Sequence, residues 1–176
     1  MTDGDELLCE GRHMLFLRRH GWEFAEHRTA KEAVMIVALT DDGRIVLVEE
    51  FRHAVNAAVI SPPAGLIGDE GPEEAVAAAR RELAEETGYE AASFELLARG
   101  PGSAGQSSEM IVFFLACGAR RTGEQAPHDR GSIRVHDVAI SDLPAWAKAR
   151  EAEGALIDPK VWAGLYLASL RPATGR

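Results

Sequence analysis

Three glutamates crowd into one short stretch of the chain, residues 80–89, which reads RRELAEETGY. On a helix, which turns about 100° per residue, Glu85 and Glu86 would lie about 60° and 40° to either side of Glu82. Like charges at these spacings destabilise a helix, and no lysine or arginine follows at a spacing that would compensate them. The stretch is therefore either a solvated acidic face or a site for a divalent cation, which clustered carboxylates bind well.

A loop rich in glycine and proline precedes this helix, and we expect residues 56–71 to form no regular element. Such a loop can bring backbone carbonyls close to the carboxylates, and this donor set suits Mg²⁺ or Mn²⁺. Pro72 suits the first position of the helix, and Gly88 suits a left-handed stop. The side chains at helical spacing that we expect to face the core are Val76, Ala79, Leu83 and Thr87.

The rest of the chain combines β-rich segments with two further helices. Residues 34–51 predict a hairpin around Asp41-Asp42-Gly43, and residues 13–28 predict a shorter pair of strands that turns near His20-Gly21. Further segments with strand character lie at residues 94–100, 109–118 and 132–140, and two helices close the chain. Strands around a central helix, with helices again at the end, predict an α/β fold whose mixed sheet is covered on both faces.

Size, charge and cysteine content exclude several classes of protein. The 176 residues are enough for one domain with a substantial core. The net charge of -9 argues against a nucleic-acid partner, because binding to a polyanion needs a basic face. Two cysteines form no disulfide framework, the N-terminus is acidic, and no apolar run approaches a membrane span. We therefore expect a soluble, untargeted protein of the reducing cytoplasm, with no membrane partner.

The glutamates belong to a longer pattern, in which Glu73 is followed after seven residues by RELAEETGY, residues 81–89. This segment resembles the Nudix box, whose family pattern is G-x5-E-x7-R-E-U-x-E-E-x-G-U, where U is a bulky apolar residue. The resemblance implies a Nudix-type α/β/α sandwich with a mixed β-sheet, formed by residues 1–176 as a single domain. Two positions depart from the pattern. Ile67 stands where the family has glycine, so Gly65 fits only if two extra residues precede Glu73, and Tyr89 replaces an aliphatic residue.

The resemblance also implies roles for individual residues. The implied ligands of Mg²⁺, with Mn²⁺ as an alternative, are Glu82, Glu85, Glu86 and a backbone carbonyl near Ala64 or Gly65. Arg81 and Glu73 would brace the loop and the helix ends. The implied reaction is hydrolysis of a nucleoside diphosphate linked to another group, because a metal can neutralise phosphate charge and activate a water molecule.

The order EEFR, PPAG, the box and PGSAGQSSE is similar to the ADP-ribose and ADP-sugar pyrophosphatase branch of the family. This implies a nucleotide-sugar substrate, cleaved to AMP or another nucleoside monophosphate and a sugar phosphate. In that branch an arginine at the position of Arg52 contacts phosphate, and a glutamate like Glu109 lies in the pocket. The catalytic carboxylate expected in the loop before the last strand would be Asp129, with Glu124 as the other candidate. Each of these residues could instead be an ordinary surface charge.

Other functions remain open on the sequence. The substrate could be a dinucleotide or another nucleotide derivative, or the domain could sense a nucleotide without hydrolysing it. The complete set of box glutamates favours hydrolysis over sensing. Residues 1–32 form a β-rich segment outside the box, and in the similar ADP-ribose enzymes such a segment often packs across a two-fold axis. The resemblance therefore implies a homodimer.

Overall fold

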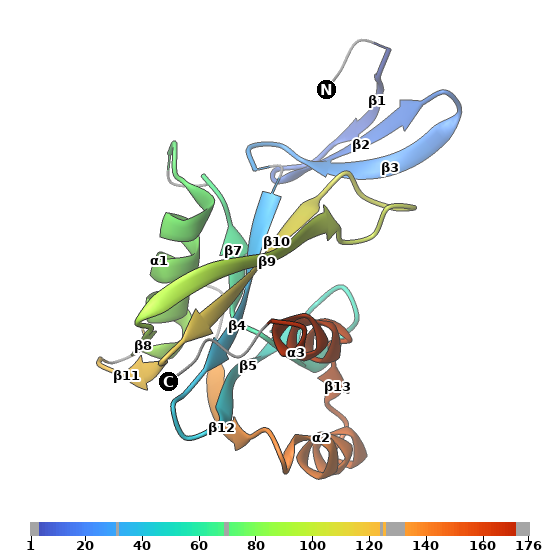
Figure 1. The fold of residues 1–176 in the computed structure, drawn as a ribbon. Coiled ribbons are helices and arrows are strands. Elements are labelled where there is room, and N and C mark those ends of the chain that lie inside the picture. The colour runs from blue at the N-terminus through green and yellow to red at the C-terminus, as the bar shows by residue number, and fades with distance from the viewer. Residues whose placement is uncertain (1–3, 31, 69–70, 124, 126–132, 172–176) are drawn as a thin grey trace.

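A mixed sheet of eight strands forms the centre of the described part of the chain (Figure 1). The structure, a computed structural model, describes residues 4–30, 32–68, 71–123, 125 and 133–171. The strands of this sheet are β4 (Glu32–Leu39), β5 (Arg44–Arg52), β6 (Ala57–Ser61), β7 (Ala64–Leu66), β9 (Ser93–Pro101), β10 (Met110–Cys117), β12 (Arg134–Ala139) and β13 (Leu156–Ile157). Their order is β13-β6-β5-β4-β10-β9, with β12 also paired to β5 and β7 to β4. The pairs β10–β4 and β13–β6 are parallel and the others antiparallel, which confirms the predicted mixed sheet.

Helices cover both faces of the sheet, as the α/β/α sandwich requires. Figure 1 shows α1 (Ala75–Thr87) on one side and α2 (Leu143–Ala152) and α3 (Lys160–Ser169) on the other. Successive residues of β4 point to opposite faces, so Ile36 packs with Leu83 of α1, whereas Val37 joins the core under α2 and α3. None of the described helices has the length and apolar character needed to cross a bilayer.

A second, smaller sheet at the N-terminus is attached to one loop of the main body. It contains β1 (Glu6–Glu10), β2 (Met14–Arg19) and β3 (Trp22–His27), and the predicted turn between the last two has positive φ at both His20 and Gly21. The Ala25 N–H donates to the Gln106 carbonyl at 2.8 Å, and the Trp22 indole donates to the Gly105 carbonyl at 3.2 Å. The loop that follows β9 therefore joins the two sheets (Figure 1).

Two predictions about the segment before the glutamates were wrong. Residues 56–71 are not all loop, because β6 pairs with β5 and the short β7 pairs with β4. The helix begins at Ala75 rather than at Pro72, because Glu74 still has an extended backbone with ψ of 143°. Its end at Gly88 was predicted correctly, with φ of 71° and a hydrogen bond from the Gly88 N–H to the Ala84 carbonyl.

The side of α1 that faces the sheet agrees with the prediction at Ala79, Leu83 and Thr87, which are buried, and differs from it at Val76. Val76 is 39% exposed and lies outside the core. The buried positions of the helix are Ala78, Ala79, Glu82, Leu83, Glu86 and Thr87. The helix therefore turns two of its glutamates inward, which a stripe read from apolar residues alone could not predict.

Candidate active site

The three glutamates of α1 do not share one environment. Glu82 and Glu86, one helical turn apart, are only 7% and 6% exposed, whereas the side chain of Glu85 is 41% exposed. The Ala64 N–H of β7 donates to Oε2 of Glu86 at 2.9 Å. Glu82 and Glu86 are therefore not part of a solvated acidic face. Their side chains lie between α1 and the short strand β7.

Gly65 lies directly against the carboxylate of Glu82. A Cβ added at this position would lie 2.0 Å from both Cδ and Oε1 of Glu82, a distance that no side chain could occupy. Only glycine at position 65 therefore lets the Glu82 carboxylate occupy this place against the backbone. The glycine of the pattern is thus displaced by two residues, and Ile67 is partly buried against the core beside α1.

Arg81 joins the helix to the segment before it. Its Nε and Nη2 donate to both carboxylate oxygens of Glu73 at 3.2 and 3.1 Å, and Nη2 also donates to the Leu66 carbonyl. Its Nη1 contacts Glu82 at 2.8 Å and Glu85 at 3.1 Å. The hydrogen bond to Glu73, followed by the charge of Glu82 and the hydrogen bonds to Glu82 and Glu85, raises the pKa of Arg81 above its ordinary value.

These contacts correct one inference from the sequence. The glutamates have no compensating cation after them, but Arg81 before them supplies one, at i,i+4 from Glu85. Glu73 is held outside the helix by the same guanidinium, which explains why α1 begins only at Ala75. Because the guanidinium of Arg81 bonds to both carboxylate oxygens of Glu73, it fixes the orientation of that side chain as well as neutralising its charge.

Negative charge is nevertheless in excess around Glu86. Burial is the main cause that raises its pKa to about 8, and the carboxylates of Glu82 and Glu50 act in the same direction. The Ala64 N–H and the Arg52 guanidinium oppose this shift without cancelling it. A divalent cation would remove this repulsion, so the charge of the site fits such an ion.

The chemistry of the donors fits a hard cation as well, since carboxylate and carbonyl oxygens are the ligands of Mg²⁺ and Mn²⁺. Within the described residues no three His, Cys, Asp or Glu side chains are already grouped as a ligand set. Instead, Oε1 of Glu82 and Oε2 of Glu85 both contact Arg81. Binding of an ion would therefore require these side chains to exchange Arg81 for the metal.

The end of β5 adds two charged side chains to the site. Arg52 pairs with Glu50 at 3.1 Å, and the charges of both affect the pKa of Glu86. Arg52 is therefore near enough for its charge to act on Glu86, and so is Glu50, which the sequence analysis did not identify. The signal that could have found it is the two-residue period of a strand, which places Glu50 on the same face as Arg52 and turns Glu49 to the opposite face.

The other predicted residues are less closely connected. Glu109 is half-buried directly before β10, where its backbone N–H donates to the Ser107 hydroxyl oxygen at 3.0 Å. This hydrogen bond attaches Glu109 to the loop before β10 rather than to α1. Asp129 and Glu124 lie outside the described residues.

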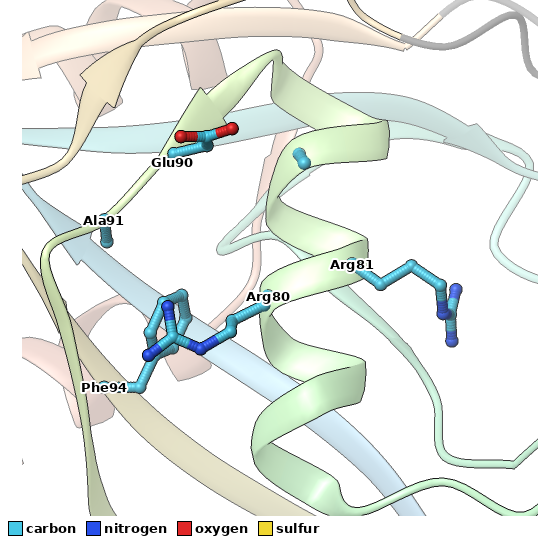
Figure 2. Close-up of a pocket in the computed structure, with 6 residues that line it drawn as sticks. Arg80, Arg81, Glu90, Ala91 and Phe94 are labelled. Carbon is cyan, nitrogen blue, oxygen red and sulfur yellow. The ribbon is translucent and has the colours of Figure 1, made fainter.

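A surface pocket of about 400 Å³ lies beside α1, but it does not contain the glutamate cluster. Figure 2 shows the guanidinium of Arg80 directed over the ring of Phe94, at 4.5 Å from its centroid, while Arg81 leaves the helix in a different direction. The lining residues are Arg80, Arg81, Ala84, Glu90, Ala91 and Phe94. Apart from Arg81, none of the residues of the proposed chemistry lines this pocket.

Comparison with known proteins places this geometry in context. The chain is 32% identical over 120 residues to an ADP-ribose pyrophosphatase of Bacillus subtilis, an alignment that covers 68% of this chain and 64% of that protein. It is 31% identical over 134 residues to an ADP-ribose pyrophosphatase of Mycobacterium tuberculosis, over 76% of this chain and 62% of the relative. The chain thus spans somewhat over three fifths of the length of these curated relatives.

The fold and a family model agree with these similarities. A solved structure described as an ADP compounds hydrolase superposes with a TM-score of 0.70 over 94% of this chain and 89% of its own, at 19% identity, a likeness that concerns the fold alone. The family model of the NUDIX domain matches residues 29–159, which include the whole of the glutamate helix and β7. This chain belongs to the Nudix domain family.

Proposed function

We propose that this protein hydrolyses the pyrophosphate bond of ADP-ribose or a related nucleoside diphosphate sugar, giving AMP or another nucleoside monophosphate and a sugar phosphate. The observation that carries the proposal is the buried pair Glu82 and Glu86, which faces β7 and has Arg52 beside it. The relatives named ADP-ribose pyrophosphatase support this choice of substrate class. We further propose that residues 1–176 act as one domain, with residues 1–32 as an accessory segment.

Nudix enzymes generally use divalent metal ions, and we propose Mg²⁺ here, with Mn²⁺ as a substitute. The ligands would be Glu82, Glu85, Glu86 and the Ala64 carbonyl. Such an ion would supply charge neutralisation of the diphosphate and a more acidic water. Burial, together with the charges of Glu82 and Glu50, raises the pKa of Glu86, and these neighbouring carboxylates are the feature of the site that supports an ion.

The side chains around the glutamates would bind and orient the substrate. Arg52 is half-exposed and pairs with Glu50 at 3.1 Å, and its guanidinium would exchange this carboxylate for a phosphate group of the substrate. Arg81 and Glu73 hold the segment before the helix against α1, and Arg81 also holds the carboxylates of Glu82 and Glu85 in place. Glu109 would contact the substrate from the start of β10, and Asp129 would accept the proton of the attacking water, as the family resemblance implies.

The test is AMP release from ADP-ribose by the purified protein with Mg²⁺, compared with the Glu82→Gln variant. We expect turnover by the unaltered protein and a loss of at least about hundredfold in the variant, because a ligand charge is removed while the shape of the side chain is kept. Glu95→Gln is the matched control, since Glu95 is an exposed glutamate of β9. No AMP release, with turnover of a dinucleotide or of another nucleotide instead, would reject the substrate class.

We also propose that the protein is a homodimer formed through the N-terminal sheet. This sheet exposes large apolar side chains, and the indole of Trp22 is the most open of them at 63% exposed. The others are Leu7, Met14 and Phe16. Light scattering of the intact chain should give twice the mass of 19.0 kDa, and a monomer at micromolar concentration would reject the proposal.

We propose the reducing cytoplasm as the compartment of this protein. Its two cysteines, Cys9 and Cys117, are exposed and unpaired, which is in keeping with such an environment.

A further inference from the structure

Tyr89 attaches the end of the glutamate helix to the sheet through its side chain. It follows Gly88, the left-handed residue that ends α1, and begins β8 (Tyr89–Glu90). Its ring is 7% exposed and packs in the core beneath α1. Its hydroxyl donates to Oδ2 of Asp137 in β12 at 2.9 Å. Burial and this hydrogen bond raise the pKa of Tyr89, so the hydroxyl remains protonated and able to donate.

Asp137 connects this hydroxyl to a third element. The Nε of Arg44, at the start of β5, donates to its other oxygen, Oδ1, and the two residues form an ion pair. One carboxylate therefore joins the end of α1, the strand β12 and the strand β5. The same strand β5 carries Glu50 and Arg52 at its far end.

The backbone at the end of α1 is bonded to the segment that follows β10, because the Gly88 carbonyl accepts from the N–H groups of Thr122 and Gly123. The Tyr89 side chain adds a bond to a different part of the sheet, the strand β12. Gly88 has no side chain, and its backbone is the link between Glu86 and the sheet. An aliphatic residue at position 89 could fill the same core space, but it would provide no directional bond. A hydrogen bond to a charged acceptor fixes the side chain more narrowly than packing does.

We propose that Tyr89 and Asp137 are positioning residues for metal binding, because their hydrogen bond fixes the last turn of α1, and with it Glu85 and Glu86, relative to β5. This inference rests on the proposed function, which assigns those glutamates to the metal. It explains why a tyrosine stands where the family pattern has an aliphatic residue. Neither residue touches the substrate or the ion itself.

The test measures Mn²⁺ binding to the metal-free full-length protein by calorimetry, without substrate, well below the unfolding temperature. We expect Tyr89→Phe, which keeps the ring, and Asp137→Asn, which weakens the acceptor, each to raise the Mn²⁺ dissociation constant about tenfold, as loss of a residue behind a metal ligand does. The double variant should bind no more weakly than the single ones, because both changes remove one interaction. The matched control is Tyr166→Phe, since Tyr166 is the only other tyrosine and is exposed on α3.

The possible results distinguish failure of the positioning role from failure of the proposed function. A dissociation constant within twofold of the unaltered protein in both variants, even with a lower unfolding temperature, would overturn the positioning role and leave a merely structural contact. Equal weakening by Tyr166→Phe would overturn it too. If the unaltered protein bound no Mn²⁺, the proposed function would fail and this inference with it.

Discussion

Replacing Gly65 with alanine tests whether the carboxylate of Glu82 must lie against the backbone of β7. The new Cβ would lie 2.0 Å from Cδ and 2.5 Å from Oε2 of Glu82, whereas non-bonded atoms prefer a separation of about 3.5 Å or more. The atoms in the way belong to the end of a flexible side chain. We therefore expect Glu82 to swing out of the site while β7 keeps its place in the sheet.

The magnitude follows from the contacts that Glu82 would lose. Its hydrogen bond with Nη1 of Arg81, at 2.8 Å, involves two charged groups, and loss of such a bond costs about 1.5–3 kcal/mol. Arg81 keeps its bidentate contact with Glu73, so the bracing of the loop survives. We expect Gly65→Ala to lower the free energy of unfolding by about 2 kcal/mol and the rate of hydrolysis by about hundredfold or more.

The assay is AMP release from ADP-ribose at saturating Mg²⁺, with urea unfolding measured on the same samples. Gly100→Ala is the matched control, because no atom lies within 4 Å of a Cβ added there. It should leave both quantities near their original values. Full turnover by Gly65→Ala would refute the assignment of Glu82 to the site, and equal losses in both variants would show a general effect of alanine rather than the contact.

Three other predictions follow from the charges of the site. Arg52→Ala should raise KM about tenfold or more with little change in unfolding, because its guanidinium is at the rim; an unchanged KM would contradict the phosphate contact. In EDTA, the free energy of unfolding should fall as the pH rises from 5 to 8, because folded Glu86, with a pKa of about 8, keeps a proton that the unfolded chain has released. Glu86→Gln should flatten this part of the urea-unfolding profile, and an unaltered slope would contradict the assignment. Arg81→Lys should lower the unfolding temperature, because an ammonium group cannot pair with both oxygens of Glu73 as the guanidinium does; equal unfolding temperatures would show that the bidentate contact is dispensable.

Local spacing was sufficient to predict the glutamate helix and its end. Helical periodicity depends on near neighbours, so the turn from Glu82 to Glu86 and the stop at Gly88 follow from the residues between them. The hairpins were predictable for the same reason, since a short turn such as His20-Gly21 specifies its own pairing. The mixed sheet with helices on both faces followed from the order of these elements.

Long-range pairing decided what local spacing could not. The segment before the helix contains prolines and glycines and looked like a loop, but β7 is held as a strand by β4, its partner some thirty residues earlier in the chain. That pairing brings Ala64 and Gly65 to the glutamates. The sequence contained both residues without showing which one the carboxylate of Glu82 would meet.

The sequence by itself determined which chemistry is present: a set of carboxylates, an arginine and a glycine stop on one helix, in the pattern of one family. Only the tertiary structure decided how these groups are used, because burial and charge coupling depend on residues that are distant along the chain. It turned Glu82 and Glu86 inward, left Glu85 at the surface, and brought Glu50 beside them. The contact between Tyr89 and Asp137, forty-eight positions apart, has the same origin: it exists because β12 pairs with β5 in the folded sheet.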